Sequence, residues 1–375
     1  MNAALRALRV AVYGSLVACL RLLIRPRHRR HFKLVVLKLD RLGDAVLSLG
    51  AVRRLTTQHG EKDTLLIVST ISGPLFRREF PQAELLLLPA FRERFWPDLL
   101  VCLIRHASKL RAISADTLVC LRHQHSDYLH AVAHLLEARR CHAARWQHGS
   151  EHTSLSFPRC AYVPYPAEAC GACLEIEAHR RVIASAMGVE ITLREVLPAL
   201  AGAPVRGGGL LICPAAGDGI REYPAPRIQE VVRLFSQRVP GMRITVCLPP
   251  GPVGRRWQDA LDGCHGGSIE WLHPASIETL ITTIACADLV LAPDSAPAHL
   301  ATALDIPGVF LLGGGHFGMF APWGQSGRQT WLWHETDCYH CQWHCRHPEA
   351  YCLTHIPPQA VAQALCAASG CGLDS

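Results

Sequence analysis

The fold class is most constrained by short apolar runs that alternate with helical patterns along the chain. Runs of strand length, rich in leucine and β-branched residues, occur at 34–39, 65–68, 85–88, 117–121, 210–213, 244–248, 288–292 and 309–312. Between them apolar residues recur at helical spacing, as from Ile277 to Ile284. Strands alternating with helices predict parallel sheets covered by helices. Nearly continuous apolar strands agree, because both faces of such sheets are buried.

Chain length and one breaker-rich segment predict two domains. The 375 residues exceed one ordinary compact core. Residues 197–209 contain Pro198, Pro204 and a glycine triplet, and a new strand follows at once. We therefore expect an α/β protein with two Rossmann-like domains, residues 33–200 and 207–375, whose parallel sheets face a central cleft. Ligands of such sheets bind beyond the carboxyl ends of the strands.

The positive charge is concentrated at the front of the sequence. Residues 1–54 hold twelve lysines and arginines against two aspartates, so this stretch has a net charge of +10. The whole chain has a net charge of +7. The remainder is therefore at −3, which argues against a nucleic-acid-binding protein. The charge asymmetry favours a local partner with an anionic surface.

An N-terminal helix within residues 1–32 is predicted to be basic and amphipathic. Its apolar stretch from Val10 to Leu20 is too short to span a bilayer, which needs about 20 residues. The arginine-rich segment from Arg25 to Arg30 follows it, the reverse of a signal peptide. We expect the helix to lie on the inner face of the cytoplasmic membrane, with a peripheral, cytoplasmic protein behind it. The alternative is a helix that packs on the protein's own surface.

One candidate catalytic residue follows the first predicted strand. The segment from Lys38 to Leu47 contains Gly43, which lets a turn approach a ligand closely, and Asp44 at the start of the next helix. An aspartate at this position is typically a helix cap. It is also suited to act as a general base that removes a proton from an acceptor hydroxyl.

Candidate anion-binding groups follow three strands of the second half. Asp294 or Ser295 is predicted to cap a helix with Pro297 in its first turn, which leaves amides for an anion, and His299 lies one turn in. Arg221, in the loop from Pro214 to Pro224, offers a fork of donors for phosphate oxygens. Gly313 to Gly315 allow close backbone approach. The alternatives are an ordinary capped helix and surface loops.

Taken together and in order, these motifs resemble the bacterial heptosyltransferases of glycosyltransferase family 9, over residues 33 to about 362. The family's Gly-Asp pair, its basic residue before an aromatic-proline pair and its Asp-Ser/Thr-Gly-x-x-His segment have counterparts here. Its glycine-rich strand end and its Ala-Pro-x-Gly segment do as well. The matching residues are Gly43-Asp44, Arg221 with Tyr223-Pro224, Asp294 to Ala301, Gly313 to Gly315, and Ala321 to Gly324.

The resemblance implies a GT-B fold and an inverting transfer of heptose from ADP-heptose to a lipopolysaccharide core or another lipid-linked saccharide. It implies no catalytic cofactor or divalent ion. By resemblance Asp44 is the catalytic base, with Arg41 and Gly43 on the acceptor side. The implied donor-binding residues are Arg221, Asp294, Ser295, His299, Gly313 and Gly314.

The sequence departs from the family pattern at three places. Ala216 and Gly217 stand where hydroxyl residues are usual, Ala296 replaces a common glycine, and no glutamate follows the 244–248 strand. These changes leave the sugar and nucleotide of the donor open. They also keep two alternatives: a GT-B nucleotide-sugar epimerase, and a catalytically inactive binding protein of the same fold.

The seventeen cysteines are mostly scattered through apolar runs, which favours buried reduced thiols in a cytosolic enzyme. One cluster at 338–352 differs: Cys338, Cys341, Cys345 and Cys352 offer four thiols within fifteen residues. Four thiols satisfy a closed tetrahedral zinc site, so we expect structural zinc here. Iron–sulfur ligation lacks its usual spacing, and buried thiols or disulfides are the remaining alternative.

Overall fold

The structure, a computed structural model, describes residues 3–90, 96–122, 127–145, 160–164, 174–202, 205–263, 269–324 and 326–370. The chain divides into two compact units: Met1–Cys170 with Leu174–Leu197, and Gly171–Cys173 with Pro198–Ser375. Each unit has its own six-stranded sheet and its own hydrophobic core.

The sheet of the first unit has the order β3-β2-β1-β4-β5-β6, and every neighbouring pair is parallel. Its strands are β1 (Arg30–Lys38), β2 (Thr64–Ser69), β3 (Glu84–Leu88), β4 (Ile113–Cys120), β5 (Glu137–Arg145) and β6 (Cys160–Pro164). The central strands are fully buried over most of their length, as the apolar runs predict.

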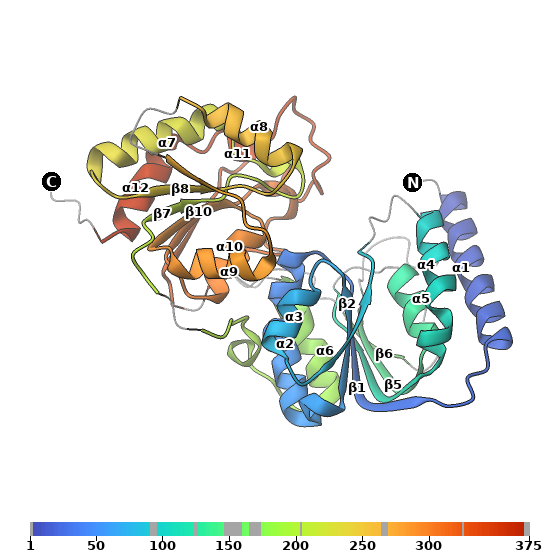
Figure 1. The fold of residues 1–375 in the computed structure, drawn as a ribbon. Helices are drawn as coiled ribbons and strands as arrows, with labels where there is room; N and C mark the ends of the chain where they lie inside the picture. Colours follow the sequence, from blue (N-terminus) through green and yellow to red (C-terminus); the bar gives the residue numbers. More distant parts are fainter. Residues whose placement is uncertain are drawn as a thin grey trace. The chain divides into compact units, whose positions relative to one another are not determined.

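Helices cover both faces of this sheet (Figure 1). One face carries α2 (Leu42–His59), α3 (Gly73–Glu79) and α6 (Leu174–Met187); the other carries α1 (Ala3–Leu23), α4 (Trp96–Arg111) and α5 (Asp127–Leu135). Among the described residues of this unit, η1 (Glu61–Asp63) and η3 (Leu193–Val196) are short 3-10 turns.

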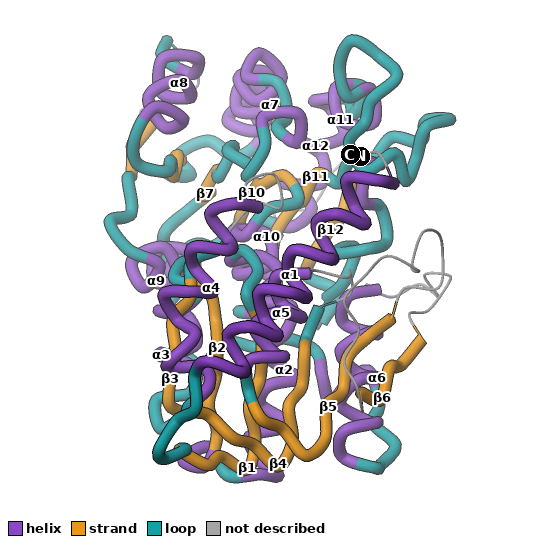
Figure 2. Tube along the Cα trace, turned by 90° about the vertical axis from the view of Figure 1, so that its right-hand side faces the viewer, coloured by secondary structure: helices purple, strands orange, loops and turns teal. Residues whose placement is uncertain are grey.

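The N-terminal helix α1 packs against α4 and α5, as Figure 2 also shows. Tyr13, Val17 and Leu20 lie in the core of the first unit, and Arg9 forms an ion pair of 2.7 Å with Asp127. One face of α1 therefore packs on the protein's own surface, as the alternative interpretation proposed. In the described part of the chain, no helix is long and apolar enough to cross a lipid bilayer.

The sheet of the second unit has the order β12-β11-β10-β7-β8-β9, again parallel throughout. Its strands are β7 (Leu210–Ile212), β8 (Ile244–Cys247), β9 (Ile269–Leu272), β10 (Leu289–Pro293), β11 (Gly308–Leu311) and β12 (Gln329–Leu332). The strand that precedes the Asp294 motif, β10, lies near the centre of this sheet.

In the second unit, α7 (Ala225–Arg238), α8 (Pro252–Leu261) and α12 (Pro358–Ala368) cover one face, and α9 (Ile277–Cys286) and α10 (Ala296–Ala303) cover the other (Figure 1). The short elements are η4 (Gly219–Arg221), η5 (Gly314–His316) and α11 (Tyr351–Thr354). Tyr223 anchors the start of α7, because its buried hydroxyl donates to the carbonyl of Ile356 at 2.6 Å.

All eight predicted strands are present, and four further strands, β5, β6, β9 and β12, were not predicted. They lie at or next to the sheet edges. Their residues are partly exposed or charged, as in β5, whose sequence is EARRCHAAR. A strand that faces solvent needs no continuous apolar run, so the hydropathy pattern does not reveal it.

The boundary between the units differs from the prediction. We expected the first domain to end at residue 200, but Pro198 onward belongs to the second unit. Leu200 N donates to Ala303 O at 3.0 Å, and the carboxylate of Asp288 accepts from the amides of Gly207 and Gly209 at 2.8 and 2.9 Å. These contacts attach the glycine-rich segment to the edge of the second unit. Residues 1–32, expected as a separate segment, are part of the first unit.

Candidate active site

The centre of the second-unit site is Asp294, directly after β10 and almost completely buried. Arg221 Nη2 donates to the main-chain oxygen of Asp294 and lies 3.2 Å from its Oδ2. His299 Nε2 lies 3.2 Å from Oδ1. Burial by itself would raise the pKa of Asp294, but Arg221, then His299 and His316, lower it to about 2. The residue is therefore a carboxylate at neutral pH.

Two tryptophans fix His299. Trp323 Nε1 donates to His299 Nδ1 at 3.1 Å, and Trp331 Nε1 donates to the carbonyl of Trp323 at 2.9 Å. A ring nitrogen that accepts a hydrogen bond carries no proton, so the imidazole proton lies on Nε2, toward Asp294. His299 is buried rather than a surface residue. Sequence reasoning placed Trp323 in a matching motif but assigned it no role.

Arg221 keeps donors beyond those that it gives to Asp294. It ends the 3-10 turn η4, and its guanidinium lies 5.8 Å from the centre of the Trp343 ring. Within the described ranges its Nε is buried and has no hydrogen-bond partner. A partly buried cation whose N–H is buried and unsatisfied is suited to bind an anion.

Ser295 occupies the predicted N-cap position of α10, and a proline lies in the first turn of that helix. The predicted side-chain cap is absent, because the hydroxyl of Ser295 donates back to the carbonyl of Pro293 at 3.1 Å. No side chain in the described part of the chain therefore accepts from the amides at the start of α10, which suits an anion.

The three positions 313–315 after β11 must be glycine because aromatic side chains pack against them, a requirement that the sequence did not suggest. A Cβ on Gly313 would lie 2.3 Å from the Trp343 ring, and a Cβ on Gly314 would lie 2.1 Å from Tyr339. His340 N also donates to Gly314 O at 2.8 Å. Small residues here admit the aromatic side chains of the 338–352 segment. That segment in turn reaches the site, because Trp343 lies against Arg221 and donates to His316 at 3.1 Å.

The four cysteines of the 338–352 segment do not form one metal-ligand group in the structure: of the four, the group of potential ligand atoms found among the described residues includes Cys338 but not Cys341, Cys345 or Cys352. Cys338 and Cys352 are buried, and Cys341 and Cys345 are half-buried. Burial raises the pKa of the Cys345 thiol, and neighbouring Cys341, Cys352 and Cys338 raise it further. Each described cysteine of the chain is a free thiol.

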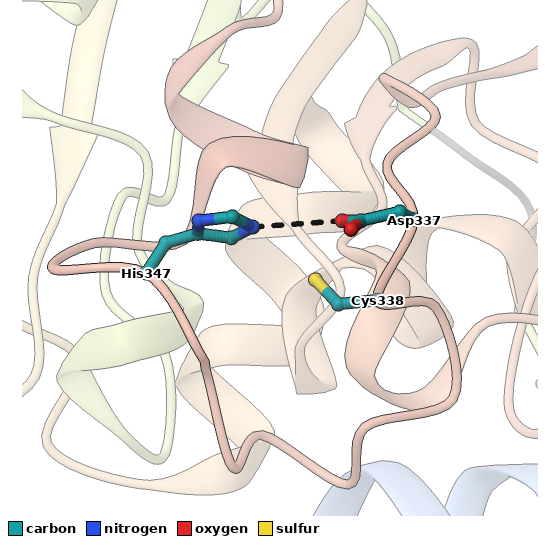
Figure 3. Close-up of side chains that lie close together, drawn as sticks. All are labelled: Asp337, Cys338 and His347. Atoms are coloured by element: carbon teal, nitrogen blue, oxygen red, sulfur yellow. Dashed lines mark ion pairs between the residues drawn. The ribbon is translucent and has the colours of Figure 1, made fainter.

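Cys338 has two further potential metal ligands beside it. Figure 3 shows the imidazole of His347 facing Asp337, with a distance of 3.6 Å between Nε2 and Oδ1 and the Cys338 sulfur nearby. One ligand atom from each residue lies within 4.8 Å of the others. Sequence reasoning did not assign Asp337 or His347 to the metal site.

In the first unit, Arg41, Gly43 and Asp44 lie where the sequence predicts, at the start of α2 beyond the carboxyl end of β1. The N-cap position belongs to Arg41, with extended backbone, and Asp44 lies in the first turn. The alternative interpretation of Asp44 as the cap is therefore wrong. An acidic residue in the first turn is still favoured by the helix dipole.

A buried charge network beside Asp44 escaped prediction. The fully buried Lys38, the last residue of β1, lies 2.8 Å from Glu175 Oε1 and 3.1 Å from Asp40 Oδ2. Burial would lower the pKa of Lys38, but Asp40, Glu175 and Asp44 raise it above its ordinary value. Arg122 and His179 complete the network, at 3.2 Å from Asp40 and 3.0 Å from Glu175. A lysine within an apolar strand was the one signal in the sequence.

A carboxylate also lies beside the Arg221 loop. Glu222 accepts from the amide of Ala216 at 3.2 Å and forms an ion pair of 2.6 Å with Arg256. Glu222, Arg256 and Trp257 line a pocket of about 170 Å³ between η4 and α8. The glutamate that the family pattern places after the 244–248 strand is absent from this sequence.

The family is decided by comparison with known proteins. The sequence model of glycosyltransferase family 9 (heptosyltransferase) matches residues 126–350, more than half of the chain. The chain belongs to glycosyltransferase family 9. This family-9 glycosyltransferase matches no curated protein sequence.

Solved structures show the same fold. E. coli heptosyltransferase WaaC with ADP is 18% identical, with a TM-score of 0.60, over 89% of this glycosyltransferase and 98% of WaaC. A family-9 glycosyltransferase from Veillonella parvula is 13% identical, with a TM-score of 0.70, over 92% and 99%. The iron-containing dodecameric glycosyltransferase TibC from enterotoxigenic E. coli is 12% identical, with a TM-score of 0.52, over 93% and 80%. The expectation of a GT-B fold is confirmed; the central cleft stays a prediction.

Proposed function

We propose that this glycosyltransferase moves heptose or a related sugar from a nucleoside diphosphate donor, with ADP-heptose as the first candidate. The acceptor is a lipopolysaccharide core or another lipid-linked saccharide. One observation carries the proposal: Arg221, Asp294 and His299 meet at the carboxyl end of β10 in a sheet of this fold. A relative of the same fold adds support, because WaaC was solved with ADP and with ADP-2-deoxy-2-fluoro heptose.

The donor diphosphate is bound by the second unit. Arg221 is fixed by Asp294 and retains a buried N–H, and the start of α10 at Ser295 provides amides. Negative charge grows on the leaving diphosphate as the sugar departs, so prepositioned donors stabilise the transition state. Asp294 does not face the diphosphate in this scheme; with His299 it positions Arg221. Gly313 and Gly314 keep the backbone beside it compact.

Asp44 is the proposed general base. Its carboxylate takes the proton of the acceptor hydroxyl while that oxygen attacks the anomeric carbon, and the bond from this carbon to the diphosphate oxygen breaks on the opposite face. The products are the inverted glycoside and the nucleoside diphosphate, with no catalytic divalent ion. The negative charge of Asp44 helps to raise the pKa of the nearby Lys38. Arg41 and Gly43, next to Asp44 at the start of α2, flank the acceptor.

A lipid-linked acceptor is supported by the outer side of α1. Leu8, Leu22 and Leu23 are 57, 68 and 81% exposed on a helix followed by Arg25 and Arg27. Exposed leucines next to arginines are typical of helices that bind an anionic membrane surface. We place the protein at the inner face of the cytoplasmic membrane on this basis.

A structural metal ion in the 338–352 segment is the second part of the proposal. Cys338, Cys341, Cys345 and Cys352 have the donor chemistry for zinc, and Cys338 lies within ligand distance of Asp337 and His347. TibC, a relative of the same fold, is described as iron-containing, so iron is the competing metal. A bound ion would brace the segment that carries Trp343 against Arg221.

The test combines donor screening with an Asp44 variant. Purified protein is incubated with ADP-, GDP-, UDP- and CDP-sugars, with and without a lipid extract, and products are identified by mass spectrometry. Asp44→Asn should lower transfer by roughly 10²–10⁴-fold while donor affinity, measured by calorimetry, is retained. Asp63→Asn, on η1 of the same unit, is the control. Unchanged transfer in Asp44→Asn would remove the base assignment, and epimerised donor without transfer would favour the epimerase alternative.

A further inference from the structure

A second candidate binding site lies in the first unit, at the edge of the sheet opposite Asp44. A pocket of about 1010 Å³ opens where β1, β4 and β5 begin, beside the C-terminal end of α1. This edge of the sheet, where the three strands begin, lies at the bottom of Figure 2. Asp44 lies beyond the other end of β1, a strand of nine residues that spans about 25 Å. The pocket is therefore separate from the acceptor residues of the proposed transfer site.

The pocket is lined mainly by cations. Five arginines contribute to its wall, against one carboxylate, Glu137. The arginines are Arg21, Arg27, Arg29, Arg111 and Arg139. Arg29 uses that carboxylate in an ion pair of 2.7 Å, and Arg139 pairs with Asp116 at 3.3 Å.

The remaining three arginines have no acidic partner. Across the described ranges neither Arg21, Arg27 nor Arg111 forms an ion pair with a carboxylate. Arg21 donates to the carbonyl of His134 at 2.8 Å. The positive charge of this wall is thus largely uncompensated within the protein.

Arg111 is a buried and firmly held part of the pocket wall. Its side chain is about nine-tenths buried at the end of α4, and it donates only to main-chain carbonyls, those of Ile24, Leu135 and Arg21, at 3.3 to 3.4 Å. Burial, then the nearby charges of Arg21 and Arg29, lower the pKa of Arg111, and the carboxylate of Glu137 opposes this shift. The carbonyls satisfy the donors of Arg111 and fix it in the wall, and an anion in the pocket would offset the repulsion between this guanidinium and those of Arg21 and Arg29.

Arginine recognises phosphate with paired N–H donors, and a cluster of arginines is its usual site. We propose that this pocket binds a phosphate group, as the phosphomonoester or phosphodiester of a larger ligand. Leu22 and Leu23 lie exposed next to Arg21, so an apolar surface adjoins the phosphate position. That arrangement fits the headgroup of an anionic phospholipid, whose acyl part would meet the leucines. The inference uses the first unit alone and does not depend on sugar transfer.

The test measures binding of the full-length protein without any sugar donor. In the first arm, co-flotation is measured with vesicles of phosphatidylcholine alone or with added phosphatidic acid. In the second arm, inorganic pyrophosphate is titrated by calorimetry. The variant is the double substitution Arg21→Gln/Arg27→Gln, two exposed side chains whose loss leaves the core intact. The matched control is Arg77→Gln/Arg105→Gln, which removes the same charge from exposed residues outside the pocket wall.

We expect binding to phosphatidic acid vesicles and a loss of roughly tenfold to thirtyfold in affinity for the pocket variant, with a smaller loss in the control. Binding of pyrophosphate but not of vesicles, lost in the pocket variant, would support the phosphate site and assign it a soluble ligand. Equal losses in both variants would show diffuse charge and overturn the proposal, as would binding in neither arm. Sugar transfer measured separately on the same protein keeps this result distinct from the proposed reaction.

Discussion

Arg221 and Asp294 are 73 positions apart in the sequence, and the guanidinium of the first donates to both the main-chain oxygen and the carboxylate of the second. The contact joins the loop after β7 to the loop after β10, two adjacent strands. Each residue explains the other: the carboxylate fixes the arginine, and the arginine keeps the buried acid ionised. The donor-binding half of the proposed mechanism depends on this pair.

The first prediction concerns the pH dependence of stability. The pKa of Asp294 is lowered from 3.8 to about 2 in the folded state. Its charge therefore stabilises the fold above the unfolded pKa of 3.8, and this stabilisation, about 2 kcal/mol, is lost as the pH falls through about 2. In Asp294→Asn we expect a lower free energy of unfolding at neutral pH. Between pH 3.8 and about 2 this free energy should also fall less steeply than in the wild-type protein. Urea unfolding over a pH series measures both, and the exposed Asp259→Asn is the control. An identical acid limb in Asp294→Asn would contradict the assignment.

The second prediction concerns the network at Lys38. Replacing Lys38 by methionine leaves Asp40 and Glu175 buried without the cation between them, so the free energy of unfolding should fall by about 3–5 kcal/mol. The double variant Lys38→Met/Glu175→Gln should recover part of this loss, because one buried charge is removed. Denaturant unfolding of the two single variants and the double variant gives the coupling energy. Strictly additive losses would show that Lys38 and Glu175 do not interact.

The third prediction concerns Gly314. A methyl group there would lie 2.1 Å from the Tyr339 ring, so Gly314→Ala should destabilise the fold by about 1–3 kcal/mol. Adding Tyr339→Ala should relieve that clash. Gly219→Ala is the control, because the nearest atom to its added carbon is 3.9 Å away. Thermal melts of the variants decide the matter, and a neutral Gly314→Ala would mean that the 338–352 segment does not pack on this glycine.

The fourth prediction concerns the metal. Purified protein should carry about one zinc or iron ion per chain, measured by inductively coupled plasma mass spectrometry. Cys345→Ser should lose most of it, whereas Cys286→Ser, a half-buried cysteine outside the cluster, should keep it. Metal-free wild-type protein, prepared without chelator and under reducing conditions, would refute the site.

The strands that end at the candidate site were predictable because they are buried on both faces, which requires continuous apolar runs. The positions of Asp44 and of Asp294 with His299 were predictable for a related reason: each follows such a strand within a few residues. The edge strands and the contact between Lys38 and Glu175 were not, and the packing of α1 was one of two interpretations that the sequence left open. Glu175 is 137 positions from Lys38 on α6, and no local pattern marks a pair at that separation.

The glycines at 313–315 show the limit most clearly. Three small residues after a strand equally fit a ligand that approaches the backbone and a side chain from the same protein, and only the fold shows Trp343 and Tyr339 above them. The sequence by itself determined the fold class, the family motifs and the loops that carry them, because burial and turn chemistry act over short stretches. The tertiary structure alone decided which charges meet, since Coulomb energy depends on distance in space. It also placed the arginine-lined pocket, whose residues come from α1, α4, α5, the segment between α1 and β1, and three strands.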